Sequence, residues 1–157
     1  MNIFFLENKE DTDLIAKSHY DKHVVKMILE TAQILSTVSR ENGIEQGYKS
    51  THKHHPMTLW AGESIENWRW LKRLGVSLCK EYTYRYGKIH KTEAVINILE
   101  EPPLEDKGFT TPPQCMPDEF RCEKNEYIKA YRNYYMKDKA HIAKWTKRPV
   151  PDWFEFL

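Results

Sequence analysis

The sequence is poor in the features that mark extracellular and membrane proteins. It has only three cysteines, an odd number without CxxC spacing, so we expect reduced thiols and no disulfide framework. It has no apolar run of about 18 residues, which argues against a membrane helix. The opening "MNIFFLENKEDTD" turns acidic too early for a signal peptide. We therefore expect a soluble, cytoplasmic protein with no membrane partner.

The sequence also lacks a net charge of one sign, because 24 Lys and Arg residues stand against 23 Asp and Glu residues. A formal charge of +1 gives no global attraction to nucleic acid or membrane. The charges are nevertheless segregated. Residues 69–91 and 121–148 are basic and contain Tyr and Trp, whereas residues 92–119 between them are acidic. Such blocks suit a local contact with nucleic acid, and solvated helix faces are the alternative explanation.

Strand signals are scarce as well. Only the opening MNIFFL forms a short apolar run outside the helical patterns, and we expect it to be a strand or an extended segment packed on the core. The remainder predicts a mainly α fold in a single compact domain, residues 1–157. Capping residues, glycines and prolines delimit the expected helices, which lie at about residues 11–40, 56–82, 93–101 and 125–143.

The first expected helix carries a polar stripe on an otherwise apolar surface. With 100° between successive residues, the polar side chains of this stripe fall within about 80° of one another. They are His19, His23, Lys26, Glu30, Gln33 and Thr37, with Lys22 just beside them. A helix that is apolar over most of its girth is largely buried, so we expect the stripe to face a functional cleft. The narrow wet face of an ordinary amphipathic helix is the alternative.

A histidine cluster precedes the second expected helix. The segment STHKHHP places His52, His54 and His55 where they can bind an anion together with the helix N-terminus. With His19 and His23 they can also ligate a metal ion, although no HExxH motif accompanies them. One or two of them can equally be hydrogen-bonded in the core. The sequence alone leaves these alternatives open.

Two segments, KEYTYRYGKIHK and AYRNYYMKDKAHIAKW, interleave tyrosines with basic residues. Nucleic-acid grooves combine aromatic faces that stack on bases with cations that contact phosphates. Together with the histidine cluster and the stripe, these segments supply the expected nucleic-acid-binding residues. They are Lys22, His52, His54, His55, Tyr84, Arg85, Lys88, His90, Lys91, Arg132 and Lys139. We therefore expect a substrate that carries phosphate, either DNA or a nucleotide.

The order of these segments resembles that of the all-α pyrimidine-dimer DNA glycosylases of the phage endonuclease V type. The segments that carry this resemblance are the opening run with the first helix, "WLKRLGVSLCKEYTYRYGKIHK", "MPDEFR" and "HIAKWTKRPVPDWF". The blocks "DKHVVKMILETAQ", "HHP" and "EYTYRYGK" are also similar to those of a group of phage and large-virus proteins, which suggests a viral protein of the host cytoplasm.

The resemblance implies a particular chemistry. In that family the N-terminal α-amine, freed by removal of the initiator Met, forms a Schiff base with the sugar C1′, assisted by an Arg–Glu pair in the first helix. The duplex is kinked and a base is flipped out. Here Asn2 is bulky for efficient Met removal, so the expected amine is that of Met1. Lys22-His23 stands in the place of the Arg–Glu pair.

The leading hypothesis is therefore a DNA glycosylase/lyase-like enzyme that acts at the sugar–base bond of a damaged or modified nucleotide. The candidate catalytic residues are His23, Glu30, Asp21, Lys26 and His19. We expect His23 to be the general acid or base. We expect Glu30 or Asp21 to be the stabilising carboxylate, and Lys26 or Lys22 to be an amine nucleophile or a phosphate clamp.

Two further hypotheses stay open at this point. The first is a metal-dependent nucleotide or phosphoester hydrolase that uses the histidine clusters. The second is a non-enzymatic, nucleic-acid-binding viral protein, whose binding falls steeply with salt. The leading hypothesis needs neither a metal nor a cofactor, and we expect the protein to be a monomer.

Overall fold

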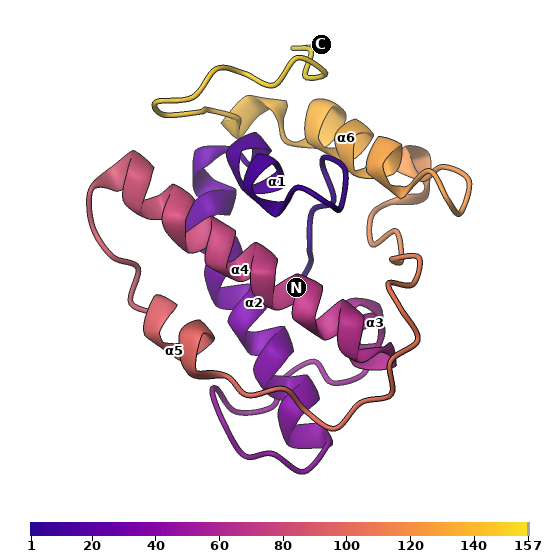
Figure 1. Cartoon of the computed structure of the whole chain (residues 1–157). Coiled ribbons are helices and arrows are strands. Elements are labelled where there is room, and N and C mark those ends of the chain that lie inside the picture. Colours follow the sequence, from indigo (N-terminus) through magenta and orange to yellow (C-terminus); the bar gives the residue numbers. More distant parts are fainter. Residues whose placement is uncertain (157) are drawn as a thin grey trace.

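The computed structural model describes residues 1–156, and all regular secondary structure in this part of the chain is helical (Figure 1). These residues contain six α-helices, two short 3₁₀ helices and no strand, so the expected mainly α fold is confirmed. The α-helices are α1 (Thr12–Ser18), α2 (Asp21–Glu41), α3 (Pro56–Glu63), α4 (Ile65–Tyr86), α5 (Glu93–Ile98) and α6 (Tyr127–Asp138). The 3₁₀ helices are η1 (Asp118–Phe120) and η2 (Ala140–Ile142).

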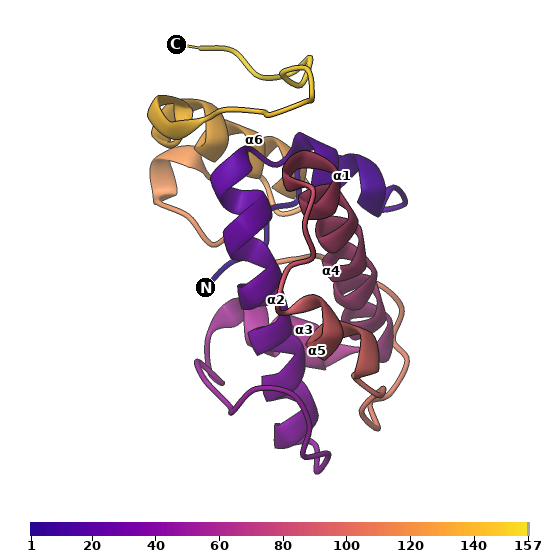
Figure 2. The same ribbon diagram turned by 90° about the vertical axis from the view of Figure 1, so that its left-hand side faces the viewer.

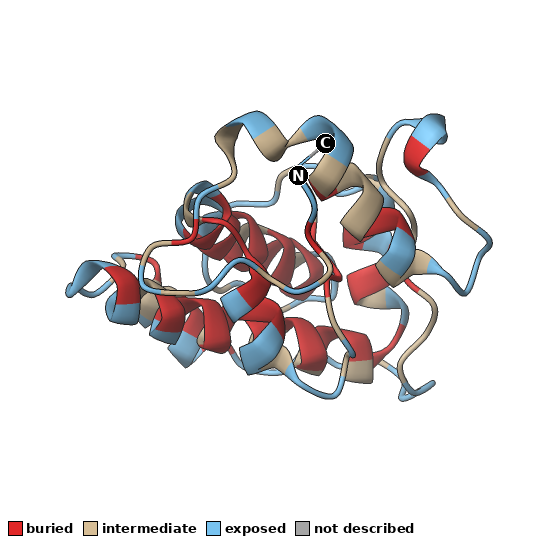
Figure 3. Cartoon of the chain, turned by 90° about the horizontal axis from the view of Figure 1, so that it is seen from above, coloured by how far each residue is buried: buried red, intermediate tan, exposed pale blue. Residues whose placement is uncertain are grey.

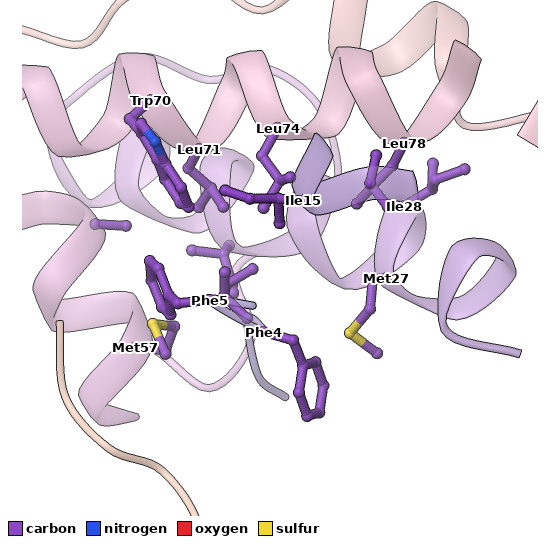
Figure 4. Close-up of a cluster of buried hydrophobic side chains, with 14 of the residues drawn as sticks. Phe4, Phe5, Ile15, Met27, Ile28, Met57, Trp70, Leu71, Leu74 and Leu78 are labelled. Atoms are coloured by element: carbon purple, nitrogen blue, oxygen red, sulfur yellow. The ribbon is translucent and has the colours of Figure 1, made fainter. Parts of the chain in front are cut away.

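The two long helices, α2 and α4, pack against each other, and each contributes more buried apolar side chains than any of the shorter helices among the described residues. Figure 4 shows Phe5 beside Met57 and Trp70 at one end of this core and Ile28 beside Leu78 at the other. Exposed residues lie on the outer sides of the helices (Figure 3). Neither α2, α4 nor any shorter helix within residues 1–156 has the length and hydropathy needed to cross a membrane.

The N-terminal segment is extended and buried. Ile3, Phe4, Phe5 and Leu6 are each 4% exposed or less, and the Phe5 ring stacks on the Trp70 ring at 5.0 Å between centroids. Burying a side chain of this size stabilises the fold by roughly 2 kcal/mol. These four side chains therefore hold the start of the chain in a fixed place beside α2 (Figure 2).

The helix expected at residues 11–40 is in fact two helices. The chain turns at His19, whose ψ of 134° is extended, and α2 begins after Tyr20. The C-terminal tail bonds to the backbone groups freed by this break: Asp21 N–H donates to the Lys144 carbonyl at 2.7 Å, and the Trp145 indole donates to the Ser18 carbonyl at 3.0 Å. A tertiary contact thus overrides the local helical pattern.

The helix expected at residues 56–82 is also divided, because Ser64 has extended backbone angles. Its hydroxyl accepts a hydrogen bond from the N–H of Glu66 at 3.3 Å, which caps α4, and another from the N–H of Lys107 at 2.9 Å. The end of α4 at Gly87, with a φ of +67°, agrees with the expectation. The last helix, α6, is shorter than expected and is followed by η2.

Arg85 lies inside the protein, which corrects its assignment as a nucleic-acid contact. Its side chain is fully buried and donates to Glu81 at 2.8 Å and to Asp21 at 3.0 Å. Arg148 from the C-terminal tail donates to the same Glu81 at 2.9 Å. No donor of Arg85 is on the surface to reach a phosphate, so this network fastens α2, α4 and the tail to one another.

Replacing Arg85 by Ala is expected to lower the free energy of unfolding by about 3–5 kcal/mol, because it leaves buried carboxylates without their partner. Chemical denaturation measures this loss. Arg69→Ala is the matched control. Arg69 lies on the exposed side of the same helix, where it pairs with Glu101. Loss of this exposed ion pair is expected to change the free energy of unfolding little. Equal stability of the two variants would contradict the structural role of Arg85.

Candidate active site

The start of the chain lies against the carboxylate of Glu30 on α2. The Met1 ammonium nitrogen is 3.3 Å from Glu30 Oε1, and the N–H of Asn2 donates to the same oxygen at 3.0 Å. The Met1 side chain is only 4% exposed, whereas the residue as a whole is half-buried. The exposed part of Met1 is therefore its backbone end, which carries the amine. A primary amine and a carboxylate thus meet at the edge of the core.

Side-chain bonds to distant parts of the chain anchor this N-terminus. The Asn2 amide donates to the Cys115 carbonyl at 2.8 Å, and its oxygen accepts from the N–H of Ile3 at 2.8 Å. The N–H of Cys115 in turn donates to the hydroxyl of Tyr131 on α6 at 3.2 Å. Sequence reasoning missed these anchors, because Asn2 and Cys115 are 113 positions apart and no local pattern connects them.

Glu30 has one oxygen that the protein leaves free. Its Oε2 atom is buried and has no hydrogen-bond partner among residues 1–156. The Nζ of Lys26 lies 3.8 Å from this oxygen, and the Lys26 side chain is 70% exposed. Buried polar atoms are nearly always hydrogen-bonded, so an unpartnered carboxylate oxygen beside an amine is unusual. Glu30 thus pairs with the amine through one oxygen, while its other oxygen makes no hydrogen bond among the described residues.

His55 is the member of the histidine cluster whose pKa is affected by the charge of the N-terminus. Burial, followed by the positive charge of the N-terminal ammonium group, lowers the pKa of His55. Its Nδ1 accepts from the N–H of Met57 at 3.1 Å, so the neutral ring carries its proton on Nε2. His52 and His54 are exposed on the preceding loop.

The other stripe residues are divided among different parts of the fold. His19 lies before α2, and its Nδ1 bonds to the Ile15 carbonyl at 2.7 Å. His23 is buried, with Nε2 and Nδ1 each 2.7 Å from a tyrosine hydroxyl, those of Tyr20 and Tyr135. Thr37 bonds to Thr51 in the loop before α3. Of the remaining stripe residues, Lys22 and Lys26 are exposed, Gln33 is half-buried and Glu30 pairs with the N-terminus.

This geometry corrects three of the candidate catalytic assignments. His19 and His23 are inside the core, and both ring nitrogens of His23 are already bonded to tyrosines. Asp21 bonds to Arg85 and to the hydroxyl of Thr146. We therefore assign structural roles to all three. The pairing of His23 with Tyr135, 112 positions away, has no local signal in the sequence.

The buried histidines predict acid sensitivity of the fold. Burial lowers the pKa of His19 from 6.5 to about 4 and, together with the nearby His19, lowers that of His23 to about 2. The unfolded chain therefore binds protons first as the pH falls below about 6.5. The contribution of the two histidines to the free energy of unfolding is fully present above that pH. Proton uptake by His19 in the unfolded chain is alone expected to lower the free energy of unfolding by roughly 3 kcal/mol between pH 7 and pH 4.

Denaturation curves at a series of pH values test this expectation. The exposed His54 offers the control, since His54→Gln should show the same pH dependence as the unaltered protein. A free energy of unfolding that stays constant from pH 7 to pH 4 would mean that the two histidines are not held neutral in the fold.

A basic loop borders the exposed face of α2. Nδ1 of His90 accepts from the N–H of Thr92 at 3.1 Å, so its Nε2 carries the proton and donates to the Val25 carbonyl at 3.2 Å. This bond fixes the loop after α4 against α2, with Lys88 and Lys91 exposed on either side of His90. In Figure 2 the N-terminus lies on one side of α2 and this loop on the other.

The remaining expected nucleic-acid contacts lie elsewhere. Arg132 on α6 donates to the Leu6 carbonyl and to Glu7, each within 2.8 Å, so its half-buried guanidinium is already engaged by the protein. Lys139 pairs with Asp138. Tyr84 is 48% exposed and lies under the Arg148 guanidinium at 3.9 Å, near the C-terminal tail. Within residues 1–156, none of these three side chains forms a hydrogen bond or an ion pair with Glu30.

The metal hypothesis finds no ligand set in the structure. Within residues 1–156, no three His, Cys, Asp or Glu side chains come close enough together to hold one ion. His19 and His23 are buried among aromatic rings, whereas the histidines at 52 and 54 are exposed. The two histidine groups that the sequence suggested as one centre are thus separate features.

Comparison with known proteins identifies the family of this chain. No curated protein and no solved structure matches the chain. The family model described as pyrimidine dimer DNA glycosylase matches residues 1–95, which is more than half of the 157 residues. The matched part contains the N-terminus, Glu30, α4 and the basic loop, and it ends before the closing segments that also carried the resemblance. The chain therefore belongs to the pyrimidine dimer DNA glycosylase family.

Proposed function

We propose that this protein cleaves the sugar–base bond of a damaged or modified nucleotide in DNA, with its N-terminal α-amine as the nucleophile and Glu30 as the catalytic carboxylate. The observation that carries the proposal is the 3.3 Å separation between the Met1 nitrogen and Glu30 Oε1. Membership of a DNA glycosylase family supports DNA as the substrate. Within the described part of the chain, the Oε2 atom of Glu30 makes no hydrogen bond, which supports this carboxylate as the proton acceptor beside the amine.

The amine supplies the bond-forming step in this proposal. Its unprotonated nitrogen attacks C1′ of the deoxyribose, and the bond between C1′ and the base breaks. The base leaves with the bonding electrons and takes up a proton. The nitrogen then loses its own extra proton, for which Glu30 is the nearest acceptor. Opening of the sugar ring, with a proton taken up by O4′, gives an imine between the protein and the sugar.

A lyase step can follow from the same imine. Removal of a proton from C2′ lets the C3′–O bond break by β-elimination, so the strand is cleaved and water later releases the protein from the sugar. Glu30 also faces the positive charge that develops on C1′ and the nitrogen, and a fixed carboxylate stabilises such charge. The exposed Lys22, Lys26, Lys88 and Lys91 supply cations for the phosphates on either side.

Borohydride trapping tests the proposal. The protein is incubated with labelled duplexes that contain an abasic site or a thymine dimer, with intact duplex and abasic single strand as controls. Reduction of the imine gives a stable covalent adduct, which we expect with the abasic duplex. Binding that falls steeply with salt, with neither an adduct nor strand cleavage, would contradict the proposal and favour a non-enzymatic DNA-binding protein.

A further inference from the structure

The exposed face of α2 beside the amine carries apolar side chains in addition to lysines. With 100° between residues, Lys22, Val25, Lys26, Leu29 and Gln33 lie within about 100° of one another. Val25 is 39% exposed and Leu29 is 37% exposed. Leu29 lies near the middle of this face and is the residue directly before Glu30. The helix thus presents a leucine to solvent next to the proposed catalytic carboxylate.

The basic loop extends this face with the same combination. Ile89 is 71% exposed and stands between Lys88 and His90, and the bond from His90 to the Val25 carbonyl fixes the loop against α2. We call Val25, Leu29 and Ile89, with the lysines around them, the Leu29 surface. In Figure 2, α2 lies between the N-terminus and the loop after α4.

The lysines of the Leu29 surface identify its partner by charge. None of the ion pairs found among residues 1–156 involves Lys22, Lys88 or Lys91. Only Lys26 has a carboxylate nearby, that of Glu30. A single exposed leucine is ordinary on any protein. Here the exposed apolar side chains are bordered by lysines that have no ion-pair partner among the described residues, and they lie beside the amine that must reach a sugar. This combination suits DNA, which offers phosphates to the lysines and apolar base faces to the apolar side chains.

We propose that Leu29, supported by Val25, is a wedge that enters the base stack of duplex DNA beside the target nucleotide. This inference rests on the proposed function, since the amine reaches C1′ in a duplex only if the base stack opens at the target. Apolar side chains that enter a base step unstack it partly and kink the duplex. Leu29 fills the resulting gap, while the lysines hold the phosphates on both sides.

Leu29→Ala separates this role from general support of the site. An abasic site in single-stranded DNA needs no unstacking, so the variant is expected to be trapped on it at the unaltered rate. On the abasic duplex we expect trapping to slow by about tenfold, because the wedge no longer offsets the cost of opening the base step beside the abasic site. Leu14→Ala is the control, since Leu14 is 42% exposed but lies on α1. It is expected to leave both rates unchanged.

A readout independent of the chemistry accompanies the trapping. A duplex with 2-aminopurine beside the abasic site is expected to gain fluorescence when the unaltered protein binds, and less when Leu29→Ala binds. The wedge would be overturned if the unaltered protein is trapped and Leu29→Ala is trapped at the same rate. It would also be overturned if Leu29→Ala slows trapping equally on the duplex and on the single strand. A fluorescence gain that depends on Leu29, in the absence of any trapping, would uphold the wedge and overturn the proposed chemistry.

Discussion

Blocking the α-amine is expected to abolish covalent trapping on abasic DNA. A Gly-Ser extension before Met1 moves the amine away from Glu30 and turns the Met1 nitrogen into an amide, which is not nucleophilic. We expect the rate of adduct formation to fall at least about a thousandfold, the scale at which an activated nucleophile contributes. Quantification of the trapped complex on a denaturing gel measures this loss.

Two controls separate loss of the amine from loss of the site. The extended protein should still bind abasic duplex, because the lysines of the Leu29 surface are unchanged. Removal of Met1 by an aminopeptidase should leave trapping intact, since the Asn2 nitrogen is already 3.0 Å from Glu30 Oε1. Either of the first two nitrogens can thus present an amine to the same carboxylate. Full trapping by the extended protein would contradict the assigned nucleophile.

Replacing Glu30 by Gln is expected to slow adduct formation by about 10²–10⁴-fold, because the amide neither accepts the amine proton nor stabilises positive charge on the sugar. The amide oxygen can still accept the hydrogen bond from Asn2, so the fold should be kept. Single-turnover trapping on the abasic duplex measures the rate.

The matched control for this variant is Glu41→Gln. Glu41 lies at the end of the same helix and pairs with the exposed Lys53. It should trap at the unaltered rate. A Glu30→Gln protein that forms the adduct within threefold of the unaltered rate would assign Glu30 to anchoring the N-terminus rather than to catalysis.

The helical fold was predictable because helices follow from local patterns. Apolar periodicity and the residues that cap or end helices, such as Gly87, are read directly from the chain. The breaks at His19 and Ser64 were not predictable, since partners far along the chain satisfy the groups that they free. For His19 these partners belong to the C-terminal tail, at Lys144 and Trp145.

The candidate site could be predicted only in part, for a related reason. The stripe on the first long helix did contain Glu30 and Lys26, and the resemblance pointed to the N-terminal amine. Periodicity gives the side of a helix but not what covers it. α6, which lies across one end of the helix pair (Figure 1), supplies Tyr135 to His23. A histidine expected in a cleft is therefore part of the core.

The charged residues of the central segment show the same limit. Arg85 and Lys88 stand three positions apart in one basic block, and charge alone does not distinguish them. The structure places Arg85 in a buried network with Glu81 and Asp21, and leaves Lys88 exposed beside α2. A basic block identifies candidates for phosphate contacts, but the ion pairs of the fold decide which cations remain for a substrate.

The most direct test of the central claim is to locate the adduct on the protein. The complex trapped with borohydride on abasic DNA is digested, and the modified peptide is sequenced by mass spectrometry. The account predicts that the sugar is attached to the α-nitrogen of the first residue, whether that residue is Met1 or Asn2. Attachment to the side chain of Lys22 or Lys26 would contradict it, and the N-terminal amine would then serve only to position Glu30.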